Sequence, residues 1–178
     1  MTLDALGNIG ELVGALGVVI SLGYLAGQIR QNTKAVKASS HHSLNDAFSA
    51  YLKLLIDNNR AAQILAIGVR NIRDLDDEQR DTFYAVLSLL FNHFENTHMH
   101  YREGLLDADQ WRRWAFAIGW YAGFPGIEVW WKNRAGIFPA AFRAMVDAQR
   151  ILQGPTNPDQ WAPADPLAEL EAVAVESA

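Results

Sequence analysis

The pattern most able to do chemistry is a glutamate followed three residues later by a histidine, Glu95 and His98. Di-iron carboxylate proteins use Glu-x-x-His on a helix to aim two ligands at one metal. His42 and Asp46 form a second pair, four residues apart, in an earlier segment. Together the pairs would supply two imidazoles and two carboxylates, a set that suits Zn²⁺, Mn²⁺ or Fe²⁺. One hypothesis is therefore a metal-dependent enzyme.

The rest of the sequence argues against catalysis. A di-iron bundle needs two Glu-x-x-His helices and two further glutamates, and this chain has one such motif. A lone histidine and glutamate more often bond to each other or to a neighbouring hydroxyl or indole. The chain has no cysteine, and it lacks Gly-x-Ser-x-Gly, a Walker loop, a dinucleotide fingerprint and His-Glu-x-x-His. We therefore expect no catalytic residues, no bound metal and no cofactor.

A second cluster is aromatic and lies between residues 111 and 131. Tryptophan and tyrosine favour protein and membrane interfaces, where the ring is buried and its polar edge stays wet. One interpretation is a docking surface for lipid headgroups or a partner. The other is an aromatic core that joins three short helices. The residues concerned are Trp111, Trp114, Trp120, Tyr121, Trp130 and Trp131.

Helix signals position these side chains, and strand signals are weak, so we predict an all-α fold. A long helix with Asp74 as its N-cap carries an apolar stripe with His98 near its centre, and His41, His93 and His100 are expected at the surface. The stripe comprises Phe83, Leu87, Leu90, Phe91, Phe94 and Tyr101. The helices are expected from the apolar N-terminal segment to residue 56, then at 61–69, 74–103, 108–121, 127–133 and 140–152, with a turn at 124–126.

The most apolar segment runs from Leu12 to Ile29, 18 residues without a charge. Runs of about this length are typical of membrane-spanning helices, since about 20 residues cross a hydrocarbon core. A buried core helix and a signal peptide are the alternatives, but no basic residue precedes the run. We predict a single transmembrane helix that continues into a cytoplasmic helical bundle. The expected parts are an N-terminal flank (1–8), the transmembrane helix (9–30), the helical domain (31–153) and a Pro-rich acidic tail (154–178).

The two sides of this segment differ in charge. Arg30, Lys34 and Lys37 follow it, which places the N-terminus outside and the bulk of the chain in the cytoplasm of a bacterial inner membrane. Small residues fall within about 60° of one another on one helix face, and such faces let helices pack closely in lipid. The face comprises Gly10, Gly14, Gly17 and Ser21.

Charge also restricts the partners. The net charge is −5, yet residues 30–70 carry six lysines and arginines against two aspartates. A basic stretch beside an acidic body suits an anionic membrane leaflet and argues against nucleic acid. The expected partners are the lipid bilayer and other transmembrane subunits, or further copies of this chain.

Three segments resemble a widespread group of small bacterial proteins of unknown function. They are VGALGVVISLGYLAGQIRQNTKA, HFENTHMHYREGLLDADQW and FPGIEVWWKNRAGIFPAAFRAMVD. The resemblance covers about residues 9–150 and implies one N-terminal span and a cytoplasmic helical domain, but no reaction.

These features predict a non-catalytic accessory or scaffolding subunit of an inner-membrane complex, such as a respiratory or photosynthetic one. Its span and its Trp-rich helices would brace partners. A homo-oligomeric membrane pore or sensor is the first alternative. A metal-dependent membrane enzyme that uses His42, Asp46, Glu95 and His98 is the second.

Overall fold

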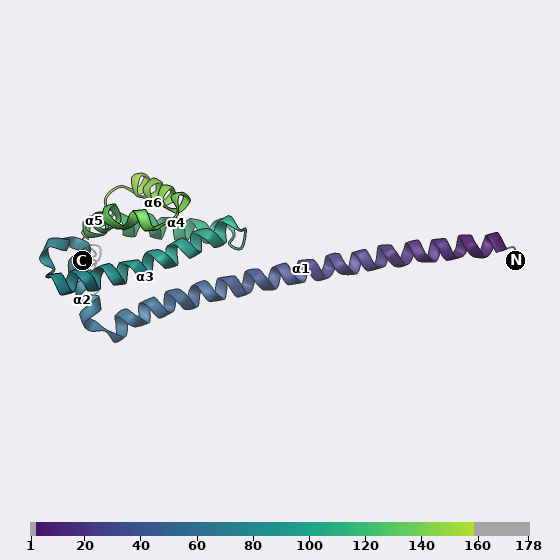
Figure 1. Cartoon of the computed structure of the whole chain (residues 1–178), viewed down its shortest axis with the longest axis horizontal. Coiled ribbons are helices and arrows are strands. Elements are labelled where there is room, and N and C mark those ends of the chain that lie inside the picture. The colour runs from purple at the N-terminus through teal and green to yellow at the C-terminus, as the bar shows by residue number, and fades with distance from the viewer. Residues whose placement is uncertain (1–2, 159–178) are drawn as a thin grey trace, which may run out of the picture. The chain divides into compact units, whose positions relative to one another are not determined.

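The computed structural model describes residues 3–158 and, within them, the side chains of all but 3–13 and 15. That range contains six α-helices, two short 3-10 helices and no strand, which confirms the predicted all-α fold (Figure 1). The chain divides into two units, Met1–His42 and Ser43–Ala178, and each is described by itself. In chain order the elements are α1 (Leu3–Asp57), α2 (Asn59–Arg70), η1 (Ile72–Asp74), α3 (Asp77–Arg102), α4 (Ala108–Ala122), α5 (Pro125–Arg134), η2 (Ala135–Ile137) and α6 (Ala140–Gln153).

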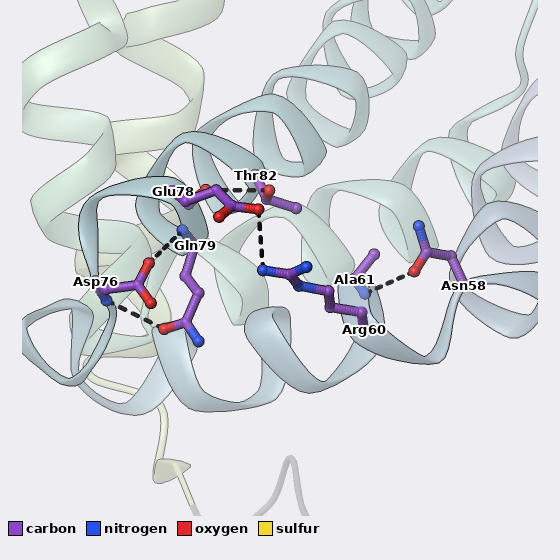
Figure 2. Close-up of polar contacts among 7 residues, drawn as sticks. All are labelled: Asn58, Arg60, Ala61, Asp76, Glu78, Gln79 and Thr82. Atoms are coloured by element: carbon purple, nitrogen blue, oxygen red, sulfur yellow. Dashed lines mark hydrogen bonds and ion pairs between the residues drawn. The ribbon is translucent and has the colours of Figure 1, made fainter.

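The first helix continues through the sequence as predicted and ends at Asp57. Asn58 interrupts it, and the Asn58 side chain accepts a hydrogen bond of 3.1 Å from the backbone N–H of Ala61 (Figure 2). This bond caps α2, because the first N–H groups of a helix have no partner within the helix. Residues 3–8, expected as a flank, already belong to α1.

The start of α3 differs from the prediction. Its N-cap is Asp76, not Asp74, because Asp76 and Gln79 form a reciprocal capping box with bonds of 2.8 and 3.1 Å (Figure 2). Asp74 instead ends η1, where its carboxylate accepts a hydrogen bond from Asn71. The two reciprocal bonds of this box satisfy two backbone N–H groups at the helix terminus, whereas a single cap satisfies one. This difference accounts for the later start of α3.

The next two helices begin at local signals. A capping box of Asp107 and Gln110 opens α4, which was expected at residues 108–121, with bonds of 2.8 and 3.1 Å. The turn expected at residues 124–126 is instead the start of α5, with Phe124 as the N-cap and Pro125 in the first turn. Proline suits that position because its missing N–H would have no partner there anyway. α6 ends where Gly154 adopts a left-handed backbone with φ of 74°.

The core of the Ser43–Ala178 unit surrounds α3. The predicted stripe is buried except at Tyr101, which is exposed because it lies in the last turn, beyond the core. His93 was expected at the surface, but it is buried, with 6% of its surface exposed. Its neighbours on α3 and α1 cover it, so the buried face of α3 is wider than its aliphatic and aromatic residues indicate. The large side chains with less than 2% exposure are Trp130, Phe83, Phe91, Phe94, Phe124, Phe142, Leu65, Leu87, Leu90, Ile118, Ile127 and Val69.

Candidate functional site

The strongest functional feature in the Met1–His42 unit is a bare apolar stretch of α1. Its large side chains between residues 16 and 29 are between 50 and 70% exposed. At 100° per residue these positions cover about 260° of the helix circumference, and the remaining face carries Gly17, Ser21 and Gln28. No charged residue occurs between Glu11 and Arg30. The exposed side chains are Leu16, Val18, Val19, Ile20, Leu22, Tyr24, Leu25 and Ile29.

The predicted transmembrane helix at residues 9–30 is not supported by the part of the chain that the structure describes. There, no helix offers a stretch of sufficient length and apolarity to cross a membrane. The side chains of residues 9–13 and 15, which belong to the expected span, lie outside the described ones.

The small face predicted for helix packing is open where it is described. A Cβ added at Gly14 or Gly17 would meet no atom within 4 Å, and Ser21 is exposed. Gly10 belongs to the residues whose surroundings are not described. Close packing of another helix on this face stays a prediction.

The aromatic cluster is mainly a core. Trp130 and Trp131 are 0 and 3% exposed, so their predicted role in a docking surface is wrong. The two rings pack around Phe91, with centroid distances of 4.7 and 5.2 Å. The Trp131 indole also donates a hydrogen bond of 2.9 Å to Asp147 on α6. Long-range packing between helices buries these rings, and sequence spacing alone does not show it.

The other four aromatic residues are half-buried against the same core. The Trp111 ring stacks on Tyr101 at 4.6 Å, while Trp114 meets the edge of Phe48 at 5.3 Å. Trp120 packs against Tyr121 and Phe124, at 5.0 and 4.8 Å. Each ring has an aromatic partner within the unit, which favours the interpretation as an aromatic core.

The proposed metal ligands do not assemble into a site. Across the described residues, no three histidine, cysteine, aspartate or glutamate side chains are grouped so as to hold a metal ion. Glu95 and His98 line one hollow of about 360 Å³, which neither His42 nor Asp46 lines. Burial and the neighbouring Arg102 lower the pKa of His98, and its ring lies 5.4 Å from that of Trp111. The four residues that the metal-dependent enzyme hypothesis requires therefore do not form one site.

A buried histidine that the sequence did not single out lies nearby on α3. The His93 ring is enclosed by the rings of Phe48, Phe94 and Trp114, with centroids 5.3, 6.2 and 5.0 Å away. Burial lowers the pKa of His93 to about 4, so its imidazole is neutral at pH 7. The sequence carries only a weak signal of this burial. His93 lies three residues after Leu90 and directly before Phe94, at the edge of the apolar stripe.

Comparison with known proteins adds no assignment. No protein-family model, no curated protein and no solved structure matches this chain. The resemblance to a group of small bacterial proteins stays a prediction, and function has to be argued from the residues.

Proposed function

We propose that this protein is a non-catalytic accessory or scaffolding subunit of a bacterial inner-membrane assembly, anchored by residues 9–30 of α1. The observation that supports the proposal is the apolar surface of α1, which is exposed around most of the helix between residues 16 and 29. Burying a large apolar side chain contributes roughly 1.5–3 kcal/mol, so covering eight of them is favourable by on the order of 10 kcal/mol. Such a segment therefore favours lipid or partner helices over water.

The shape of the apolar surface favours insertion over lying flat on the membrane. A helix that lies in the interfacial plane needs one apolar and one polar face. Here Ile20 and Leu25 lie about 140° apart around the helix, and both are at least half exposed. A helix that is apolar all round is typical of burial in a core or a bilayer.

The charges beside this segment support one orientation. Arg30, Lys34 and Lys37 fall on one face of α1, at spacings of four and three residues. No acidic residue occurs between Glu11 and Asp46, so this basic face is not neutralised along the helix. Cytoplasmic ends of spans carry such an excess of lysine and arginine. The proposed topology is single-pass, with the N-terminus outside.

Cysteine labelling tests the anchor directly, because the chain has no cysteine of its own. Single variants Asn8→Cys, Ile20→Cys and Ser39→Cys are treated with a membrane-impermeant maleimide in spheroplasts. We expect labelling of Asn8→Cys in intact spheroplasts, of Ser39→Cys only after lysis, and of Ile20→Cys in neither case. Labelling of all three only after lysis, with extraction of the protein by carbonate, would overturn the proposal.

A charge introduced into the segment gives an independent test with a matched control. Ile20→Arg should release the protein from membranes, because an arginine at a helix centre opposes insertion by about 2.5–3.5 kcal/mol. Val36→Arg lies on the same helix beyond the segment, where Val36 is also exposed, and should leave attachment unchanged. Equal membrane fractions for both variants would contradict the assigned role of residues 9–30.

Purification from native membranes in mild detergent separates an accessory subunit from a self-assembling pore or sensor. A complex with other proteins at defined stoichiometry supports the first function, and a homo-oligomer supports the second. Gly14→Leu should disrupt either assembly, since it fills the small face. Gly27→Leu, about 140° away around the helix, is the control.

A further inference from the structure

A compact basic patch follows the apolar segment of α1 directly. It consists of Arg30, Lys34 and Lys37, which are all exposed and belong to the Met1–His42 unit. At about 100° per residue the three positions lie within about 60° of one another around the helix, and at ~1.5 Å per residue they span about 10 Å along it. Three cations are thus gathered on one face, beside the end of the apolar surface.

The positive charge of the basic patch is not neutralised along the helix. No aspartate or glutamate occurs between Glu11 and Asp46. In the part of the chain that the structure describes, none of the three cations forms an ion pair. Like charges at spacings of three and four residues repel one another on a helix. An anion that lies across the patch relieves this repulsion, which points to an external anionic partner.

The direction of α1 aims the basic patch toward the apolar segment. Cα–Cβ bonds in an α-helix tilt toward its N-terminus, and for these three residues that direction leads back to Ile29. Long lysine and arginine side chains at the end of a span extend in this way to the headgroup layer. Lys37 lies about 10 Å beyond Arg30, so its extended side chain comes within one Debye length, about 8 Å at physiological salt, of the same layer. All three cations therefore act on lipid phosphates.

The chemistry of the basic patch distinguishes lipids by their net charge. An arginine guanidinium donates two parallel hydrogen bonds to a phosphate, and a lysine ammonium attracts it as a point charge. In a zwitterionic lipid the phosphate is accompanied by a choline or ethanolamine cation, which the neighbouring lysines repel. An anionic phospholipid has no such cation and gains the full attraction, so the patch favours this class.

We propose that the basic patch binds the headgroups of anionic phospholipids and enriches them around α1. The inference rests on the proposed anchoring by residues 9–30, and it adds a lipid partner that the anchor itself does not require. The apolar segment needs only hydrocarbon, which every phospholipid supplies. The three aligned cations beside it provide the preference for one headgroup charge.

Energy transfer from the protein to labelled lipids tests this preference. The full-length Ser39→Cys variant carries a donor dye about 180° around the helix from Arg30, and it is reconstituted in phosphatidylcholine vesicles. The acceptor is a trace of phosphatidylglycerol or of phosphatidylcholine, each with the same acyl-chain fluorophore and an unmodified headgroup. We expect at least about twofold stronger transfer to phosphatidylglycerol at physiological salt. The difference should largely disappear in 1 M salt, where the Debye length falls to about 3 Å.

Two variants with equal net charge show whether the basic patch is responsible. The patch variant combines Arg30→Gln, Lys34→Gln and Lys37→Gln, and it should transfer energy equally to both lipids. The control removes three exposed arginines outside α1 and should keep the preference; its substitutions are Arg70→Gln, Arg73→Gln and Arg113→Gln.

The outcomes separate this inference from the proposed anchor. Transfer to phosphatidylcholine reports attachment alone, so strong but equal transfer to both lipids in the parent chain would overturn the inference and leave the anchor intact. A preference that survives in the patch variant would also overturn it, because other residues would then select the lipid. Transfer to neither lipid would overturn the anchor and the inference together.

Discussion

The His93 ring on α3 lies against the Phe48 ring of α1, with centroids 5.3 Å apart and planes inclined by 29°. The contact joins residues 45 positions apart in the sequence and removes the imidazole from water. Burial disfavours the charged form of a histidine, which is why the pKa of His93 falls to about 4. The same contact makes His93 a source of acid sensitivity.

Stability should fall as the pH drops from about 6.5 to about 4. In that window the unfolded chain binds a proton at His93 and the folded chain does not, so protonation favours unfolding. The lowered pKa corresponds to at most about 3 kcal/mol between these limits. Urea unfolding of the parent and of His93→Phe at several pH values measures the contribution of His93 to this loss of stability. If the free energy of unfolding of His93→Phe falls with pH as steeply as that of the parent, other groups cause the loss.

Local signals in the sequence account for most helix boundaries. The Asp107 and Gln110 box and the break at Asn58 depend on residues within one turn, so they could be predicted. The burial of Trp130 could not, because it depends on Phe91 and Phe138, at 4.7 and 6.3 Å, from other elements.

The functional features also differ in whether the sequence alone could predict them. The apolar segment of α1 is visible in composition alone, since it needs no partner to be recognised. The enclosure of His93 is not, because it depends on the ring of Phe48, which is 45 positions away in the sequence.

Gly126→Ala should destabilise the fold by at least about 2 kcal/mol. A Cβ at Gly126 would overlap the Gly68 carbonyl, where α5 crosses α2, and backbone cannot move aside as a side chain can. Gly136→Ala is the matched control, because a Cβ there meets no atom within 4 Å. Thermal unfolding of both variants provides the measurement. Similar melting temperatures for the two would show that the crossing is looser than the structure has it.

Glu128→Gln should weaken the contact between α5 and α6 modestly, by less than about 1 kcal/mol at pH 7. Glu128 accepts from Lys132 at 2.9 Å and from Arg150 at 2.7 Å, and these bonds, the Lys132 one first, lower its pKa. The group is partly exposed, so water screens the interaction. Because the folded pKa is lowered, this contribution is present above the ordinary pKa of glutamate and is lost in acid. If the difference in free energy of unfolding between the parent and Glu128→Gln grows in acid, ionised Glu128 does not have this stabilising role.

Thr156→Val should loosen the attachment of the chain after α6 to α4. The Thr156 hydroxyl donates to the Trp120 carbonyl at 2.7 Å, and its backbone N–H donates to the Gly123 carbonyl at 3.0 Å. Valine keeps the shape but loses the hydroxyl, which leaves a part-buried carbonyl without this donor and is destabilising by about 1 kcal/mol. Thr156→Ser retains the hydroxyl and should lie closer to the parent chain. Amide hydrogen exchange at residue 156 measures the effect, since faster exchange in the valine variant alone reports local opening. Equal exchange in both variants would show that the backbone bond to Gly123 holds this segment without help from the side chain.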